Sequence, residues 1–125
     1  MATILVVDDN VRLANTIASF LTMEAHDVTE AHSAEEAIES IGLNPPDICL
    51  LDINMPGIDG LEICRRIKGA VPATTVLIMS GRTASDDQAQ ALAAGAAEHL
   101  PKPMSLVMLR EAIARYAPAA PSEDS

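Results

Sequence analysis

The residues of this sequence best suited to chemistry all follow short apolar segments of the chain. They comprise three carboxylates, an amide, a hydroxyl and an amine, namely Asp8, Asp9, Asp52, Asn54, Ser80 and Lys102. Clustered carboxylates repel one another unless a cation lies between them, and an all-oxygen set of ligands suits Mg²⁺ or a similar hard divalent ion. If these residues meet, the sequence therefore predicts a metal-assisted site.

Other kinds of catalytic site find little support in the sequence. Neither the G-x-x-x-x-G-K nor the G-x-G-x-x-G phosphate-binding motif occurs, and there is no Ser-His-acid or Cys-His arrangement. What remains is a carboxylate nucleophile, with a metal and an amine to neutralise an incoming phosphoryl group. An aspartyl-phosphate is a recognised covalent intermediate of this kind, and its formation depends mainly on positioning and charge stabilisation.

Five apolar segments alternate with five segments of helical periodicity, and this alternation would bring the six residues together. The expected strands are 3–7, 26–31, 48–51, 75–79 and 96–100, and the expected helices include 11–23, 34–41, 61–67, 86–94 and 106–116. Strict alternation predicts a parallel α/β sheet with helices on both faces. Because parallel strands point the same way, their carboxyl ends share one edge of the sheet.

Two helices carry more specific expectations. Ser33 and Glu36 form a capping box that starts the second helix. Gly42 is expected to end it, and Asn44-Pro45-Pro46 to prevent it from continuing. The fourth helix, rich in alanine, has Leu92 as its one large apolar residue. Little packing can therefore hold this helix, and we expect it to be the least firmly held element.

Length and charge limit the remaining classes of function. The 125 residues suit one domain, expected over residues 1–117, with residues 118–125 as a disordered tail or the start of a linker. A formal charge of -10 argues against direct nucleic-acid binding and against docking to an anionic membrane. No apolar run is long enough to span a membrane, so no membrane insertion is expected. Cys49 and Cys64 are interpreted as reduced structural thiols, which suits a cytoplasmic protein.

Taken in order, these motifs resemble the response regulator receiver domains of two-component signalling. The resemblance rests on Asp8-Asp9, on Asp52 within L-D-I-N-M-P-G-I-D-G, on Ser80 and on Lys102-Pro103, and it covers about residues 3–117. It implies a bacterial protein. It also implies a flavodoxin-like three-layer sandwich with strand order 2-1-3-4-5 and five helices.

The resemblance also implies roles for individual residues. Asp52 is expected to be the phosphoacceptor, and Asp8 and Asp9 to hold Mg²⁺ or Mn²⁺ together with Asp52 and the backbone carbonyl of Asn54. Ser80 and Lys102 are expected to contact phosphoryl oxygens.

Further expectations concern residues that tune or transmit the signal. Arg82 and the Asn54 side chain occupy positions that adjust the lifetime of the phosphoryl group in the family. The Lys102–Pro103 peptide bond is expected to be cis. His99 stands where receivers usually carry Tyr or Phe, and its coupling to Ser80 as a switch is a hypothesis. An imidazole differs from those rings because it titrates near neutrality.

The expected mechanism is a signalling switch in a single-domain protein that catalyses only its own phosphorylation and dephosphorylation. A sensor histidine kinase or a histidine phosphotransfer protein would supply the phosphoryl group. A downstream protein target would bind the surface formed by the fourth helix, the fifth strand and the last helix. The protein is expected as a monomer or a phosphorylation-dependent dimer.

Two alternatives stay open. Phosphatases of the dehalogenase type also carry an aspartate at a strand end, but they place a second Asp two residues later, where this chain has Asn54. A pseudo-receiver would bind partners without phosphorylation, and the intact acids and Lys102 argue against it. The chain is interpreted as a stand-alone regulator, with truncation from an output domain as the alternative.

Overall fold

The computed structural model of the protein describes residues 2–55, 59–81, 85–102 and 105–118, and side chains of the fourth helix from Gln88 onward. The strands are β1 (Thr3–Val7), β2 (Asp27–Ala31), β3 (Ile48–Asp52), β4 (Thr75–Ser80) and β5 (Glu98–Pro101). The helices are α1 (Val11–Met23), α2 (Ala34–Leu43), α3 (Gly60–Ala70), α4 (Ser85–Ala93) and α5 (Leu106–Tyr116). Each expected element is present: β1, α1 and α5 have the expected boundaries, and the boundaries of the others differ by at most three residues.

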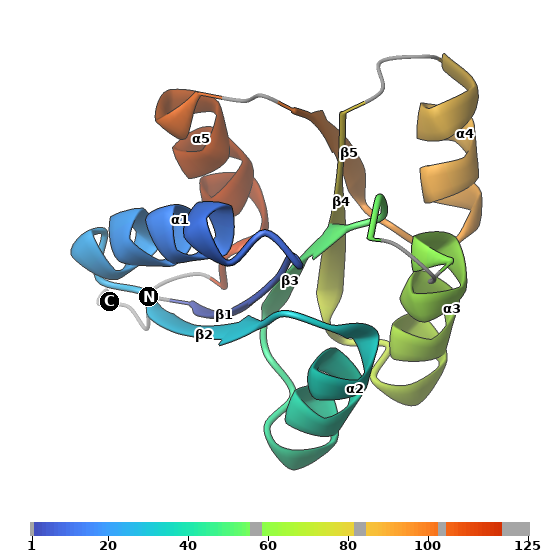
Figure 1. Ribbon diagram of the computed structural model, residues 1–125, viewed down its shortest axis with the longest axis horizontal. Helices are drawn as coiled ribbons and strands as arrows, with labels where there is room; N and C mark the ends of the chain where they lie inside the picture. The colour runs from blue at the N-terminus through green and yellow to red at the C-terminus, as the bar shows by residue number, and fades with distance from the viewer. Residues whose placement is uncertain (1, 56–58, 82–84, 103–104, 119–125) are drawn as a thin grey trace.

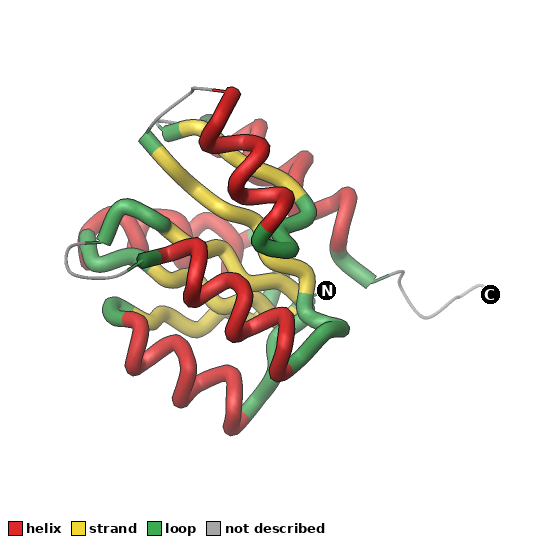
Figure 2. The backbone as a smooth tube through the Cα atoms, turned by 90° about the vertical axis from the view of Figure 1, so that its right-hand side faces the viewer, coloured by secondary structure: helices red, strands yellow, loops and turns green. Residues whose placement is uncertain are grey.

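The five strands form one parallel sheet in the order β2-β1-β3-β4-β5, which confirms the predicted topology. Helices α1 and α5 lie on one face of the sheet, and α2, α3 and α4 lie on the other (Figures 1 and 2). Among the described residues, no helix is long and apolar enough to cross a membrane.

Strand β3 runs through the middle of the sheet and contributes to both cores. Ile48 and Leu50 pack toward α1 and α5, whereas Cys49 and Leu51 pack toward α2, α3 and α4. All of these residues are buried, as expected for a strand covered by helices on both faces. Asp52 is therefore the last residue of a strand whose whole length is fixed by packing.

Helix α2 begins as predicted but ends later than predicted. The Ser33 hydroxyl accepts a hydrogen bond from the Glu36 backbone N–H. The expectation that Gly42 ends the helix is wrong, because α2 continues to Leu43 and Asn44 is its C-cap. The stop comes from Pro45, since the residue before a proline is driven into an extended conformation, and Asn44 has φ −144° and ψ 91°.

Helix α4 packs against the sheet through alanines and not through Leu92. Leu92 is 55% exposed, whereas Ala91 in the helix and Ala94 just after it are buried. The alanine side chains allow the helix to lie close to the sheet but remove little apolar surface from water. This arrangement agrees with the expectation that α4 is weakly held.

Two helices end in the same hydrogen-bond pattern with different residues at the left-handed position. After α1, the N–H of His26 bonds to the carbonyl of Leu21 and Ala25 has φ 71°. After α4, the N–H of Ala96 bonds to the carbonyl of Ala91 and Gly95 has φ 103°. Both are Schellman motifs, in which glycine is the usual left-handed residue because a Cβ is strained there.

This comparison predicts opposite effects of two exchanges. Ala25→Gly should raise the free energy of unfolding by about 0.5–1 kcal/mol, because it removes the Cβ strain. Gly95→Ala should lower it by about 1–2 kcal/mol, since the new Cβ would lie 2.9 Å from Cγ of Lys68. Urea denaturation of both variants measures the difference, and the account fails if the two changes have the same sign.

Candidate functional site

The parallel sheet brings three carboxylates together at its carboxyl edge. Asp8 follows β1, Asp9 comes next in the chain, and Asp52 ends β3, which lies beside β1 in the sheet. One oxygen from each of these three side chains lies within 4.8 Å of the other two. Asp8 and Asp52 are buried and Asp9 is exposed, so the cluster has an inner and an outer side.

Lys102 joins the two buried carboxylates. Its Nζ lies 2.8 Å from Oδ2 of Asp8 and 3.3 Å from Oδ2 of Asp52. The backbone N–H of Lys102 donates to the carbonyl oxygen of Ser80 at 2.7 Å, which fixes the lysine beside the end of β4. The predicted meeting of Asp8, Asp52, Lys102 and Ser80 at this edge is therefore observed.

The two buried carboxylates are oriented by the same local device. Oδ1 of Asp8 accepts the backbone N–H of Asn10 at 2.9 Å, and Oδ1 of Asp52 accepts that of Asn54 at 3.0 Å. Each bond spans two residues and forms an Asx-turn. Because Oδ1 of each residue is occupied in this way, Oδ2 of each is the oxygen that faces Lys102.

Burial and neighbouring charge act in opposite directions on Asp52. Burial raises the pKa of its carboxyl group most strongly, and the Asp8 carboxylate raises it further. The backbone N–H of Asn54 and the ammonium group of Lys102 lower that pKa, but burial prevails. The folded protein therefore retains a proton on Asp52 to a higher pH than the unfolded chain does.

The donor set fits a hard divalent cation. Three carboxylate oxygens lie close together, two of them beside a single amine, and one of the acids opens to solvent. Oxygen donors with an open side are the environment in which Mg²⁺ binds while keeping some of its water ligands. Asp8, Asp9 and Asp52 are the described residues that could hold it.

The other predicted residues divide into two groups. Ser80 is buried, and Asn54 is exposed with its Nδ2 atom beside Gly81, 3.8 Å from where a Cβ would lie. Arg82 and Pro103 lie outside the described residues, so the lifetime role of Arg82 and the cis Lys102–Pro103 bond stay predictions.

His99 points toward the α4 side of the sheet. It pairs in register with Ile78, which belongs to the core under α2, α3 and α4. The imidazole is 7% exposed, and neither ring nitrogen has a hydrogen-bond partner among the described residues. Ser80 lies two residues beyond Ile78 on the same face of β4, so His99 and Ser80 share the side that α4 covers.

Two further residues shape the site and are not among those predicted from the sequence. Asn10 caps α1 through its side chain and supplies the N–H that holds Asp8. Asp59 caps α3, because its side chain accepts the N–H groups of Leu61 and Glu62. An Asn or Asp immediately before an apolar helical stripe is the signal that identifies both caps.

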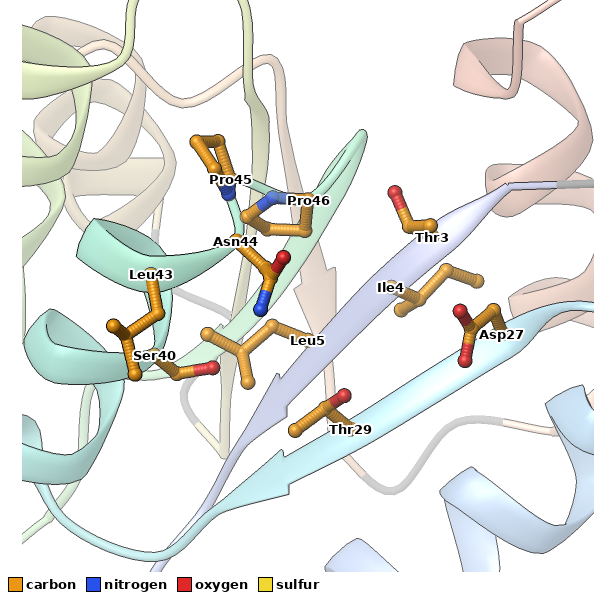
Figure 3. Close-up of a pocket in the computed structure, with 10 residues that line it drawn as sticks. All are labelled: Thr3, Ile4, Leu5, Asp27, Thr29, Ser40, Leu43, Asn44, Pro45 and Pro46. Carbon is orange, nitrogen blue, oxygen red and sulfur yellow. The ribbon is translucent and has the colours of Figure 1, made fainter.

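Two pockets differ in their relation to the carboxylates. One of about 570 Å³ reaches the site itself, because Lys102 and Gly81 line it together with side chains of α1 and α5. Another of about 440 Å³ lies between α2 and the starts of β1 and β2, where Thr3 and Asp27 line it (Figure 3). Since strands begin there, this second pocket is at the end of the sheet opposite to the acids.

Comparisons with known proteins agree with this geometry. A profile of the response regulator receiver domain family matches residues 4–114. The response regulator MprA of Mycobacterium tuberculosis is 36% identical over 103 residues, which are 82% of this chain and 45% of MprA. The chain thus spans less than half the length of this curated relative.

Solved structures show the same fold. A CheY-like receiver domain protein from Methanospirillum hungatei superimposes with a TM-score of 0.87 at 25% identity, covering 92% of each chain. NtrX from Brucella abortus gives a TM-score of 0.86 at 32% identity, covering 92% of this chain and 26% of NtrX. The receiver domain of DrrB, whose structure is of a BeF3-activated form, gives 0.85 at 25% identity, covering 93% of this chain and 97% of that one.

The site predicts that Asp52→Asn stabilises the protein in metal-free buffer at neutral pH. The pKa of the Asp52 carboxyl group is higher in the folded protein than in the unfolded chain. Such a group stabilises the fold at pH values below its pKa in the unfolded chain, and this stability is lost as the pH rises through its pKa in the folded protein. Neutral Asn removes that loss, so the free energy of unfolding should rise by about 1 kcal/mol. The gain should shrink as the pH falls toward about 4, the ordinary pKa of Asp.

Thermal denaturation with a chelator, measured from pH 4 to pH 8, tests this expectation. Asp27→Asn is the matched control, because Asp27 is exposed and its exchange should change stability by less than about 0.5 kcal/mol. A gain for Asp52→Asn that does not depend on pH would show that the carboxylate charge is not its cause.

Proposed function

Because the chain belongs to the response regulator receiver domain family of two-component systems, we propose that it is a phosphorylation-activated receiver with Asp52 as phosphoacceptor. The observation that carries the proposal is the pair of buried carboxylates, Asp8 and Asp52, sharing the ammonium group of Lys102. An amine in contact with both acids is well placed to neutralise a phosphoryl group on either of them.

The proposed reaction transfers a phosphoryl group from a phosphohistidine. An Asp52 carboxylate oxygen bonds to phosphorus as the bond between phosphorus and the donor imidazole nitrogen breaks. The imidazole retains the electron pair of that bond and takes a proton from solvent. Hydrolysis of the acyl phosphate by water later releases phosphate and restores the carboxylate, so the protein acts only on its own phosphoryl group.

Residues of this chain supply most of what the transfer needs. The N–H of Asn54 fixes one oxygen of Asp52, and Lys102 supplies positive charge at the other. Asp8, Asp9 and Asp52 would hold Mg²⁺ or Mn²⁺, with the backbone carbonyl of Asn54 as a further ligand. The ion would neutralise the charge that builds up between the acids and the phosphoryl oxygens.

Phosphorylation would act on the α4 side of the sheet. A phosphoryl group adds roughly 1.5 to 2 negative charges and three acceptor oxygens, which would draw Ser80 and Lys102 toward it. Ser80 and His99 share the face that α4 covers, and α4 is held by alanines. We propose that movement there alters the surface of α4, β5 and α5, and that a downstream protein target binds this surface.

We also propose a phosphoryl donor, a cellular location and an oligomeric state for the receiver. A sensor histidine kinase or a histidine phosphotransfer protein would be the donor, in the cytoplasm, and the receiver would be a monomer or a phosphorylation-dependent dimer. Asn54 and Arg82 would set the phosphoryl lifetime, and the Lys102–Pro103 bond would be cis. The receiver would extend over residues 1–117, with residues 118–125 as a tail.

The first prediction of this proposal is a single phosphoryl adduct. Incubation with acetyl phosphate and Mg²⁺ should add one labile phosphoryl group, visible by intact mass, and Asp52→Asn should add none. Lys102→Ala should slow the reaction by roughly 100-fold, the scale of losing one charge-stabilising group. Asp27→Asn should react like the unaltered protein.

The outcomes separate the candidate functions. An absent adduct in the folded protein would contradict the receiver function and favour a pseudo-receiver. Rapid release of many phosphate molecules per protein would indicate a phosphatase, which the amide of Asn54 argues against because it cannot serve as a general acid or base.

The second prediction concerns the metal. At about 100 times its dissociation constant, Mg²⁺ should raise the free energy of unfolding by roughly 2.7 kcal/mol. Asp9→Asn should reduce this gain, because Asp9 is the solvent-facing acid of the cluster, whereas Asp27→Asn should leave it unchanged. Equal Mg²⁺-dependent shifts in thermal denaturation of all three proteins would contradict the assigned ligands.

A further inference from the structure

Helix α3 begins with a buried glycine, Gly60. Glycine is less favourable than alanine inside a helix, because its backbone loses more conformational freedom on folding. Gly60 does not have a positive φ, so the backbone conformation does not require a glycine at this position. The reason for the glycine must therefore lie in the residues that surround it.

The space that a side chain of residue 60 would need is filled by Ile53. A Cβ at residue 60 would lie 2.6 Å from Cβ and 2.7 Å from Cγ2 of Ile53, and it would also overlap the Cα of Ile53. These separations are far shorter than the roughly 3.5–4.0 Å at which two non-bonded carbon atoms attract each other. Helix α3 can therefore lie directly against the backbone of Ile53 only because residue 60 has no side chain.

Two elements that are fixed by other contacts hold the backbone of Ile53. Its N–H donates to the carbonyl oxygen of Met79 in β4 at 3.2 Å, and Gly60 of α3 lies against its Cα. The start of α3 is fixed by the cap of Asp59, and the helix is anchored in the core by three buried side chains. These are Ile63, Cys64 and Ile67. An added Cβ at residue 60 would therefore displace Ile53 more readily than α3.

Ile53 is the middle residue of the turn that orients Asp52. Oδ1 of Asp52 accepts the N–H of Asn54 at 3.0 Å, so the geometry of this bond depends on the backbone of Ile53 between them. A displacement of the Ile53 Cα would move the N–H of Asn54 away from Asp52. It would also move the backbone carbonyl of Asn54, which is the proposed further ligand of the metal ion. The contact between Gly60 and Ile53 therefore acts on both the phosphoacceptor and the metal site.

The turn at Asp8 shows why such a contact is needed at Asp52. Oδ1 of Asp8 accepts the N–H of Asn10 at 2.9 Å, and Asn10 is itself the N-cap of α1, so the turn leads directly into its helix. Helix α3 begins only at Gly60, so a longer connection separates Asp52 from the helix that follows it. The close approach of Gly60 to Ile53 links that helix to the turn across this connection.

We propose that Gly60 is a positioning residue of the site, whose missing side chain lets α3 hold Ile53 and thereby the N–H and carbonyl groups of Asn54. The part that concerns the metal ion rests on the proposed function, whereas the part that concerns the hydrogen bond to Asp52 does not. A purely structural role of Gly60 would lower the stability of the fold without a selective effect on Asn54.

Gly60→Ala tests the proposal, and Gly69→Ala is the matched control in the same helix, because a Cβ at residue 69 would meet nothing within 4 Å. Backbone amide exchange is followed by NMR in metal-free buffer at neutral pH. In Gly60→Ala the N–H of Asn54 should exchange about tenfold faster or more, the effect of losing a hydrogen bond to a charged group. The N–H of Asn10, in the equivalent turn at Asp8, should keep its rate. Gly69→Ala should leave both rates unchanged.

A titration with Mg²⁺ alone tests the effect on the metal site. The dissociation constant, measured from the backbone amide signals of the folded protein, should rise about tenfold in Gly60→Ala, a difference of about 1.4 kcal/mol. It should not change in Gly69→Ala.

Two exchanges at Asp59 keep the inference testable if Gly60→Ala does not fold. Asp59→Ala and Asp59→Asn both remove one negative charge, but only asparagine retains a good cap for the start of α3. Asp59→Ala should therefore speed the exchange of the Asn54 N–H, because the first turn of α3 is then free to move away from Ile53. Asp59→Asn should leave that rate unchanged.

The inference is overturned if Gly60→Ala leaves the exchange rate of Asn54 unchanged, or if it speeds exchange at Asn10 as much as at Asn54. Equal effects of Asp59→Ala and Asp59→Asn would also overturn it. If the unaltered protein is phosphorylated but Gly60→Ala has no selective effect on Asn54, only this inference fails. If the effect on Asn54 is observed but the unaltered protein forms no phosphoryl adduct, only the proposed function fails.

Discussion

The structure depends on one electrostatic constraint, which is that two buried carboxylates must share one amine. Asp8 and Asp52 end neighbouring strands, and both would be costly to bury without a compensating charge. Lys102 supplies that charge from a position 94 residues after Asp8, beyond the edge strand β5. The amine reaches the acids only if β1, β3, β4 and β5 are in register, so the site and this part of the sheet must form together.

Side-chain alternation along the strands divides the site into two sides. Asp8, Asp52 and Lys102 continue the alternate positions whose side chains pack toward α1 and α5, such as Val6, Leu50 and Leu100. Ser80 and His99 continue the opposite set, which packs toward α4. The charged groups and the residues expected to respond to them therefore lie on different faces of one sheet. A change in charge at Asp52 on one face can therefore affect Ser80 on the other face, because the two residues lie on neighbouring strands.

The sequence predicted the strands and their terminal residues because buried parallel strands have a simple signature. The first, third and fourth apolar segments were short and each was followed by a polar residue, which places Asp8, Asp52 and Ser80 without further information. The exposure of Leu92 could not be predicted because the buried face of a helix depends on how closely it approaches the sheet, and small alanine side chains allow an approach that buries them instead. Gly42 was misjudged because a glycine permits a helix end, but the following prolines impose it. The lack of hydrogen-bond partners for the His99 ring among the described residues could not be foreseen, since it depends on which neighbours surround the ring.

The weak packing of α4 and the unpaired imidazole of His99 affect the stability of the same interface. Burying an alanine side chain contributes far less than the roughly 1.5–3 kcal/mol gained by burying a leucine, so α4 is held with little free energy. The cost of an unsatisfied imidazole is of similar size and falls on the same interface, where His99 lies beside Gln88 and Leu92 of α4. If the helix were firmly packed, the cost of the unpaired imidazole would be small beside the free energy that holds the helix in place. At this weakly packed interface the two free energies are of similar size. A rearrangement that gives the His99 nitrogens hydrogen-bond partners would therefore recover a free energy comparable to what holds α4.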